Sequence, residues 1–288
     1  MSGRRGPADL AVYAAVAYGL AYTLDYTAIL PLLGEGRSLA ALPLLLARMA
    51  APALGAYAAY LAAGRPGSLS GWTAVRPPSV GALLASAAAA LAGYTLSLPI
   101  SLAAGLTLGP CGPLAGLAGA QLALASALAL AGGLAAGVSV NALAALGEEA
   151  GWRGYLLDRL SASLGFWPAA LAVGVAWGLW HAPLVWSGYD YVIPHLGGCG
   201  PGASGPAALA VFTAYTASAG LVAAGLRRAY NTSVAPAAFH GTVNAVAGFY
   251  AALVAGSRLL APPAGLSVAA GMAAVAAAVG VLRRGGEG

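Results

Sequence analysis

The stretch AGLAGAQLALASALALAGGLAAGVSVNALAALG, from Ala115 to Gly147, contains no charged residue. A helix that crosses the hydrocarbon core of a bilayer needs about 20 apolar residues. The segment 115–165 that contains this run is too long for one upright crossing and barely long enough for two. The run is followed at once by EEAGWR (148–153), which places three ionisable side chains directly after a long apolar segment. The stretch therefore predicts helix inside a membrane, with polar chemistry at its end.

The composition of the whole chain supports the same class. Apolar residues make up 60% of the 288 residues and charged residues only 7%, whereas soluble domains carry about 25% charged residues. A soluble protein of this length would lack a polar surface, but lipid can replace that surface if every backbone group is satisfied inside a helix. We therefore predict an all-α, polytopic membrane protein with a single domain over residues 1–288.

Glycine- and proline-rich joints divide the chain into about eight apolar segments. The predicted transmembrane helices cover residues 9–33, 38–63, 80–107, 115–150, 166–186, 206–226, 233–256 and 261–282. Small residues four apart, as in the pairs Gly133/Gly137 and Gly174/Gly178, favour close approach between helices.

The basic residues predict the orientation of these helices. All 13 are arginines, and they lie singly or in pairs between apolar runs rather than in a basic patch with interleaved aromatic residues, so we predict no nucleic-acid partner. If the N-terminus is cytoplasmic, ten arginines fall in inner segments and only Arg37 and Arg258 fall in outer loops, as the positive-inside rule requires. Both termini are then cytoplasmic. This parity requires an odd number of crossings in 115–165, so we predict one span there plus a cytoplasmic or partly re-entrant extension, with a break at Gly132–Gly133.

The two cysteines, Cys111 and Cys199, both fall in outer loops of this topology and have similar Gly/Pro-rich surroundings. We hypothesise a disulfide between them, because oxidation is permitted on the external face of a membrane. Two unrelated free thiols remain the alternative, because connectivity does not follow from sequence.

Ionisable residues inside apolar spans are candidates for function, because each costs about 2.5–3.5 kcal/mol on insertion scales. Asp25 and Arg48 lie at similar distances from the turn at residues 34–37. At 1.5 Å per residue their depths in an antiparallel hairpin differ by about 3 Å. We interpret them as a structural ion pair.

The segment EEAGWR (148–153) differs from that pair. Glu149 and Arg153 are separated by one helical turn, so they can form an ion pair in the favoured order. Glu148 points about 100° away from Glu149 and has no local partner. A carboxylate that lacks both solvent and a counter-charge is a stronger proton acceptor, as a general base must be. The alternative interpretation is a cytoplasmic helix end with ordinary surface charges.

Two histidines strengthen the functional interpretation. His181 lies in WGLWH (177–181), in the middle or outer part of its predicted span, and His240 and Asn244 project from one face of another. A lone histidine in a membrane helix usually bonds to another helix. Two histidines, an asparagine and an unpaired glutamate on three spans form a set that can polarise water and stabilise an oxyanion.

These three motifs resemble those of the CAAX-protease and bacteriocin-processing (CPBP) family of intramembrane glutamic endopeptidases, which includes the type II CAAX prenyl protease, or Ras-converting enzyme. The family pattern is Glu-Glu-x-x-x-Arg, then Phe-x-x-x-His, then His-x-x-x-Asn or Asp. This chain has EEAGWR (148–153), WGLWH (177–181) and HGTVN (240–244). The resemblance covers about residues 115–256, which would be the catalytic core. The chain departs from the pattern at Trp177, where the family usually has Phe.

The resemblance implies a role for each matching residue. Glu148 would activate water with help from His181, and His240 and Asn244 would stabilise the tetrahedral oxyanion. The supporting residues Glu149 and Arg153 would hold the helix geometry, while Trp177 would affect the shape of the substrate pocket. The implied protein is a multi-pass protease of the cell membrane that acts on peptide or lipidated protein substrates. The sequence does not identify the substrate or an oligomeric state.

The resemblance implies no cofactor, but the sequence leaves alternatives. Glu148, His181 and His240 could instead bind zinc, since two histidines and a glutamate are ligands of catalytic zinc sites. From other functional classes, a transporter or permease and a non-catalytic immunity or scaffold protein would also fit buried polar groups in a helical bundle. The motif HExxH of metalloproteases is absent. The serine motif GASG (202–205) lies in a predicted outer loop, and we interpret it as coincidental.

Overall fold

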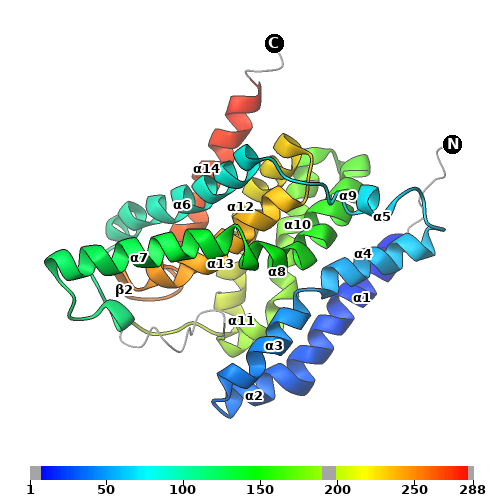
Figure 1. Cartoon of the computed structure of the whole chain (residues 1–288). Helices are drawn as coiled ribbons and strands as arrows, with labels where there is room; N and C mark the ends of the chain where they lie inside the picture. Colours follow the sequence, from blue (N-terminus) through cyan, green and yellow to red (C-terminus); the bar gives the residue numbers. More distant parts are fainter. Residues whose placement is uncertain (1–7, 190–198, 285–288) are drawn as a thin grey trace.

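A computed structural model of the chain describes residues 8–189 and 199–284, and these residues are almost entirely helical (Figure 1). In the first half the elements are α1 (Ala8–Leu24), the π-helix η1 (Asp25–Ile29), α2 (Leu30–Gly34), α3 (Ser38–Arg48), α4 (Ala51–Ala62), α5 (Leu69–Trp72), α6 (Val80–Ala103), β1 (Thr107–Leu108) and the 3₁₀-helix η2 (Gly112–Leu114).

The second half contains the region with the motifs. Its elements are α7 (Gly119–Gly137), α8 (Val140–Glu149), the π-helix η3 (Ala150–Leu156), α9 (Leu157–Leu164), α10 (Phe166–Trp180), α11 (Ala182–Ser187), α12 (Gly205–Tyr230), α13 (Val234–Ala251), β2 (Val254–Ala255) and α14 (Leu266–Arg284). Each of the eight predicted segments contains a helix. The all-α, polytopic membrane class is therefore confirmed.

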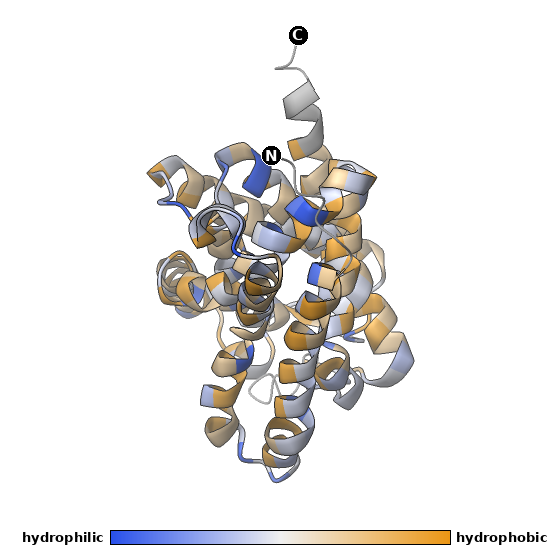
Figure 2. Cartoon of the chain, turned by 90° about the vertical axis from the view of Figure 1, so that its right-hand side faces the viewer, coloured by the Kyte–Doolittle hydropathy of each residue, from blue (hydrophilic) through white to orange (hydrophobic). Residues whose placement is uncertain are grey.

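Several helices are long and apolar enough to cross a membrane. Within the described residues they are Ala8–Gly34, Ser38–Ala62, Val80–Ala103, Gly119–Gly137 and Gly205–Tyr230, and shorter apolar helices cover Phe166–Trp180 and Leu266–Val279. Hydrophilic residues form only scattered patches on these helices (Figure 2). The side chains that face outward are largely apolar, as expected where lipid is the solvent.

The predicted break at Gly132–Gly133 is wrong. Helix α7 continues through both glycines and ends at Gly137, and the interruption falls at Val138–Ser139. Gly133 lies against the α13 residue Val246, and Gly137 lies against Thr242 further down α13. Because a glycine has no side chain, α7 approaches α13 closely along this stretch, and its glycines serve packing rather than a break.

The path of residues 115–165 is nevertheless a single passage along α13. Gly133 contacts Val246, Gly137 contacts Thr242, and Ala142 in the next helix contacts Gly241. The contacted residue of α13 thus moves toward its N-terminus as the chain advances through α7 and α8. Helices α7 and α8 therefore continue in one direction, antiparallel to α13. This agrees with one crossing plus an extension, and the extension is η3 and α9.

Two ion pairs join several helices at one end of the bundle. Arg159 of α9 lies 3.0 Å from Asp9 at the start of α1, and Asp158 lies 3.0 Å from Arg227 near the end of α12. We name this the arginine end; it carries Arg65, Arg76, Arg159, Arg227 and Arg228. Arg153, one of the ten arginines that the sequence places in inner segments, is buried in η3.

The opposite end is held by a disulfide and a short sheet. Cys111 and Cys199 form a disulfide with their Cα atoms 5.2 Å apart, so the disulfide prediction is confirmed. Strands β1 and β2 pair antiparallel beside it, with Thr107 opposite Ala255. Arg258 donates to the carbonyl of Cys199 at 3.2 Å. We name this the disulfide end; it ties the loops after α6, α11 and α13 together.

Candidate active site

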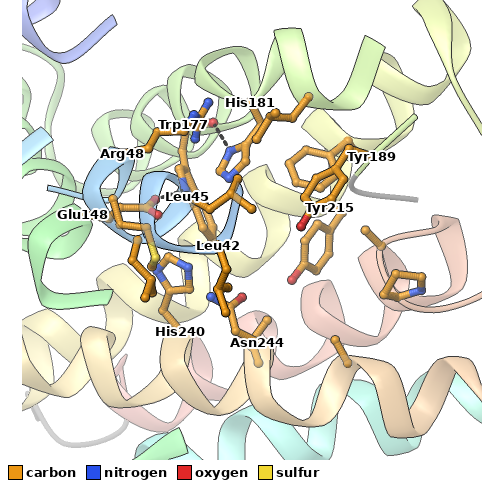
Figure 3. A pocket seen from close by; sticks show the side chains of 18 of the residues that line it. Leu42, Leu45, Arg48, Glu148, Trp177, His181, Tyr189, Tyr215, His240 and Asn244 are labelled. Atoms are coloured by element: carbon orange, nitrogen blue, oxygen red, sulfur yellow. Dashed lines mark hydrogen bonds between the residues drawn. The ribbon is translucent and has the colours of Figure 1, made fainter. Parts of the chain in front are cut away.

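A cavity of about 510 Å³ opens between α3, α11, α12 and α13, and Glu148 lies in its wall (Figure 3). Glu148 is near the end of α8, is 2% exposed, and is fixed from one side. The indole Nε1 of Trp177 donates to Glu148 Oε2 at 2.8 Å. As predicted, Glu148 has no ion-pair partner on its own helix. Its hydrogen-bond donor, Trp177, comes from α10.

Trp177 lies at the centre of the site. Besides its bond to Glu148, its ring centroid lies 5.9 Å from that of His181 and 4.9 Å from that of His240. The guanidinium of Arg153 lies over the same ring at 4.6 Å from the centroid. The sequence suggested only a change in pocket shape at this position. The signal that could have revealed more is the indole N–H, a donor that phenylalanine lacks.

His181 occupies the junction between α10 and α11 and lines the cavity. Its Nδ1 lies 3.0 Å from the carbonyl oxygen of Trp177. A carbonyl oxygen can only accept, so Nδ1 carries the proton and donates to it. The other ring nitrogen, Nε2, is then an acceptor in the neutral ring. This geometry presents a second proton acceptor beside Glu148 in the same cavity.

His240 and Asn244 reach the cavity from α13, one turn apart. The Nδ1 of His240 lies 3.0 Å from Glu149 Oε1, and the carboxylate accepts this hydrogen bond. Sequence reasoning missed this contact, which crosses between helices. The bond fixes the ring, and when His240 is protonated its Nε2 is a donor.

Glu149 connects the two halves of this arrangement. Its Oε1 accepts from Arg153 Nη1 at 2.8 Å, which confirms the predicted ion pair, and it also accepts from His240. Both partners of the ion pair are almost completely buried. Removing one partner of a buried ion pair costs several kcal/mol of stability. The Glu149–Arg153 ion pair is therefore a fixed support for the His240 ring.

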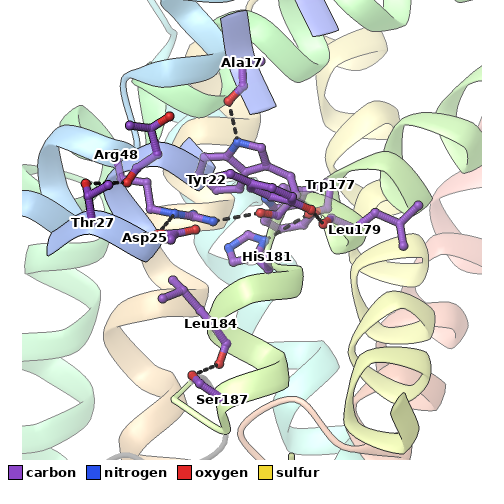
Figure 4. A network of polar contacts seen from close by, with 12 residues as sticks. Ala17, Tyr22, Asp25, Thr27, Arg48, Trp177, Leu179, His181, Leu184 and Ser187 are labelled. Atoms are coloured by element: carbon purple, nitrogen blue, oxygen red, sulfur yellow. Dashed lines mark hydrogen bonds and ion pairs between the residues drawn. The ribbon is translucent and has the colours of Figure 1, made fainter. Parts of the chain in front are cut away.

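The predicted ion pair of Asp25 and Arg48 is confirmed, and it lies beside the cavity. Arg48 Nε donates to Asp25 Oδ1 at 2.7 Å, and Nη2 donates to the carbonyl of Trp180 at 2.8 Å (Figure 4). Its guanidinium lies 3.6 Å from the centre of the Trp180 ring. Arg48 also lines the cavity. The pair therefore anchors Trp180, the residue directly before His181, and holds the Arg48 guanidinium at the cavity wall.

Other residues considered from the sequence do not join this cavity. Ser204 of the GASG motif is exposed at the start of α12 and is not part of the cavity wall. The third histidine of the chain, His195 in the Gly/Pro-rich segment before Cys199, lies outside the described residues. Among the residues that the structure describes, no three His, Cys, Asp or Glu side chains are grouped so that they could hold a metal ion.

Comparison with known proteins supports the resemblance seen in the motifs. Residues 129–246, which contain all three motifs, match the family described as type II CAAX prenyl endopeptidase Rce1-like. A curated protein of Methanococcus maripaludis, named CAAX prenyl protease 2, is 43% identical over 53 residues. The match covers 18% of this chain and 20% of that protein, so the chain matches about a fifth of the relative's length. By these motifs and this match, the chain is a membrane protein related to the CPBP and Rce1-like CAAX proteases.

Proposed function

We propose that this chain is an intramembrane endopeptidase of the CAAX-protease type that hydrolyses peptide bonds with water activated by Glu148. The proposal rests on one observation: Glu148, His181, His240 and Asn244 come from three separate parts of the bundle and line one cavity. Substrates are membrane-associated peptides or proteins, and the name of the Methanococcus relative suggests prenylated CAAX-type proteins as one class.

Glu148 and His181 are suited to activate water. A water molecule held between the free oxygen of Glu148 and Nε2 of His181 would lose a proton to the carboxylate while its oxygen attacks the carbonyl carbon of the substrate. A general base must be held within hydrogen-bonding distance of the proton that it removes. Here the bond from Trp177 to Glu148 and the bond from His181 to the Trp177 carbonyl fix both groups.

His240 and Asn244 are suited to stabilise the oxyanion. Attack converts the carbonyl oxygen into a negatively charged oxygen, which needs donors already aimed at it. Protonated His240 donates from Nε2, because Glu149 occupies Nδ1, and the amide of Asn244 supplies a second donor. When the tetrahedral intermediate collapses, the C–N bond breaks. The proton held by Glu148 passes to the leaving amine, so the products are a carboxylic acid and an amine.

The test uses purified full-length protein in liposomes with a set of apolar peptides, and products are identified by mass spectrometry. We expect Glu148→Gln to reduce cleavage by about 10²- to 10⁴-fold, the usual contribution of a general base. Glutamine keeps an acceptor for Trp177, so folding is retained. The matched control is Glu35→Gln, which changes an exposed carboxylate paired with Arg37 and leaves cleavage unchanged.

Cleavage that persists in Glu148→Gln would contradict the proposal. Solute flux that depends on Glu148, without any peptide product, would favour the transporter instead. We also propose that no metal takes part, and chelators should therefore leave cleavage unchanged. Loss of activity with chelators, restored by zinc, would favour zinc held by Glu148, His181 and His240.

The substrate can be sought with an inactive form. Proteins that accumulate uncut in membranes with Glu148→Ala, and are shortened in membranes with the active protein, are candidate substrates. Their cleavage positions would show whether a prenylated C-terminus is required.

A further inference from the structure

His181 lies at an interruption between two helices. Helix α10 ends at Trp180, and α11 begins at Ala182. Pro183, in the first turn of α11, has no N–H to donate to the carbonyl of Leu179, four residues earlier. The regular ladder of helical hydrogen bonds is therefore broken beside His181, and the backbone there depends on bonds from other parts of the chain.

Those bonds come from the N-terminal hairpin, the name we give to residues 8–48, which form α1, η1, α2 and α3. The hydroxyl of Tyr22 donates to the Leu179 carbonyl at 2.7 Å (Figure 4). Nη2 of Arg48 donates to the Trp180 carbonyl at 2.8 Å. The two consecutive carbonyls directly before His181 are thus both held by the hairpin.

The hairpin also fixes the side chain of Trp180. The indole Nε1 donates to the carbonyl of Ala17 at 2.9 Å, and the Arg48 guanidinium lies 3.6 Å from the centre of the ring. His181 meets the same ring edge-on, with centroids 4.9 Å apart. Trp180 is fully buried. His181 therefore packs against a residue whose backbone and side chain are both fixed by the hairpin.

Arg48 is itself fixed by Asp25. Its Nε donates to Asp25 Oδ1 at 2.7 Å, and neither side chain is more than 3% exposed. Asp25 begins the π-helix η1, and π-helical turns are frequent at functional sites. The Glu149–Arg153 pair, whose arginine lies in the π-helix η3, supports His240 in a similar way. Each histidine of the cavity is thus supported by a buried carboxylate–arginine pair.

We propose, on the basis of the protease function proposed above, that Arg48 and Tyr22 are positioning residues for His181 and that Asp25 acts through Arg48. By holding the two preceding carbonyls, they fix Nε2 of His181 where it receives the attacking water. A displacement of about 1 Å at a reacting group can reduce turnover by about 10²-fold. The hairpin lies outside the matched residues 129–246, yet it contributes to catalysis through His181.

Arg48→Lys tests this role in the purified full-length protein in liposomes. Lysine keeps the positive charge but lacks the planar fork that joins two acceptors and stacks on a ring. With apolar peptides that the native protein cleaves, we expect kcat to fall by about 10- to 100-fold, since small displacements of a reacting group act on turnover. We expect KM to stay within about twofold, because binding of the peptide does not depend on the position of His181.

The matched control is Arg159→Lys. Arg159 also ties α1 to another helix, through Asp9, but it is not part of the cavity wall. We expect its kcat and KM to stay within about twofold of the native values. Equal losses of kcat in the two variants would show that Arg48 only holds the fold together. A higher KM with unchanged kcat in Arg48→Lys would show that Arg48 binds the substrate instead. Either result would overturn the proposal.

The position of His181 can be observed without any cleavage. The chain contains three histidines, so protein labelled with ¹⁵N in histidine alone gives few imidazole signals in an NMR spectrum, and His181→Gln identifies those of His181. We expect these signals to shift in Arg48→Lys and to stay in place in Arg159→Lys, with the His240 signals unchanged in both. His181 signals that stay in place in Arg48→Lys would overturn the proposal.

A milder variant keeps the test valid if Arg48→Lys fails to fold. Tyr22→Phe removes only the hydroxyl that donates to the Leu179 carbonyl. Its control is Tyr26→Phe, which alters an exposed ring four residues further along. We expect a shift of the His181 signals and a fall in kcat of about 2- to 10-fold in Tyr22→Phe alone. Neither change in Tyr22→Phe would overturn the role of the hairpin.

The two proposals fail in different ways. Cleavage that depends on Glu148 but is unaffected by Arg48→Lys and Tyr22→Phe would overturn the positioning role and leave the protease function intact. No peptide product from the native protein, with His181 signals that still shift in both variants, would refute the protease function and leave the positioning of His181 by the hairpin intact.

Discussion

At the scale of single residues, the site is organised by bonds between helices. Trp177 binds Glu148 and lies beside both imidazole rings, and Glu149 binds both Arg153 and His240. Glu148, His181 and His240 are each held at one atom by a hydrogen bond. Such preorganisation reduces the movement needed when the substrate is bound.

The bond from Trp177 to Glu148 should matter for turnover. Trp177→Phe removes one donor and leaves a buried carboxylate oxygen without its partner, a change worth about 1–3 kcal/mol. We expect the turnover number to fall by about 10- to 100-fold, since 1.4 kcal/mol is about tenfold in rate, with little change in KM. The control is Trp186→Phe, which alters a half-exposed ring on α11. Equal effects of the two variants would show that the indole donor is not used.

The Glu149–Arg153 ion pair that supports His240 should contribute to the stability of the fold. Glu149→Gln leaves Arg153 buried without its counter-charge, which typically costs about 3–5 kcal/mol. We expect a large drop in the thermal unfolding temperature in detergent, together with loss of cleavage. The matched control, Glu35→Gln, breaks a pair that is about 60% exposed, and such pairs contribute at most about 1 kcal/mol. Similar unfolding temperatures for both variants would contradict this view of the site.

At the scale of elements, close helix contacts depend on particular glycines. A Cβ atom at Gly137 would lie 2.6 Å from the Cα of Thr242 on α13, and one at Gly178 would lie 2.8 Å from the Cα of Thr213 on α12. These distances involve backbone atoms, so neither contact can relax by turning a side chain. The small-residue pairs noted in the sequence therefore mark real interfaces.

The two faces of α7 should respond differently to the same substitution. Gly137→Ala pushes α7 away from α13 at Thr242, two residues from His240, and overpacking of this kind costs about 1–3 kcal/mol. Gly132→Ala places its methyl group where no atom lies within 4 Å. We expect a lower unfolding temperature and reduced cleavage for Gly137→Ala, and neither for Gly132→Ala. Indistinguishable variants would show that the α7–α13 contact is not tight.

At the scale of the whole molecule, the disulfide joins two loops that are far apart in sequence. Cys111 and Cys199 are separated by 88 residues. Backbone bonds of the same region link Gly256 to Cys199 and Cys111 to Ala252. The cross-link therefore stabilises the C-terminal end of α13, the helix that carries His240 and Asn244.

Removing that cross-link should weaken the fold. For a loop of this length, loss of a disulfide costs about 4–5 kcal/mol in the chain-entropy model. We expect the double variant Cys111→Ala/Cys199→Ala to unfold at a lower temperature, and reductant to lower the unfolding temperature of the native chain alone. Equal thiol labelling of the native chain with and without reductant would show that the disulfide does not form.

Local and compositional features of this protein followed from the sequence. The membrane class follows from the total content of apolar and charged residues, which does not depend on how the chain folds. The Glu149–Arg153 pair follows because residues four apart on a helix are neighbours. The matching depths of Asp25 and Arg48 follow from the fixed rise of a helix. The motif residues were also identified, and the fold brings them to one cavity.

Contacts between distant segments were decided only by the tertiary structure. The partner of His240 lies 91 residues away, and the donor to Glu148 lies 29 residues away on another helix. The break after α7, the burial of Arg153 and the cavity itself likewise depend on how the helices pack. Apolar helices of similar composition can pack in many ways, and side-chain shape together with a few buried polar bonds selects one arrangement.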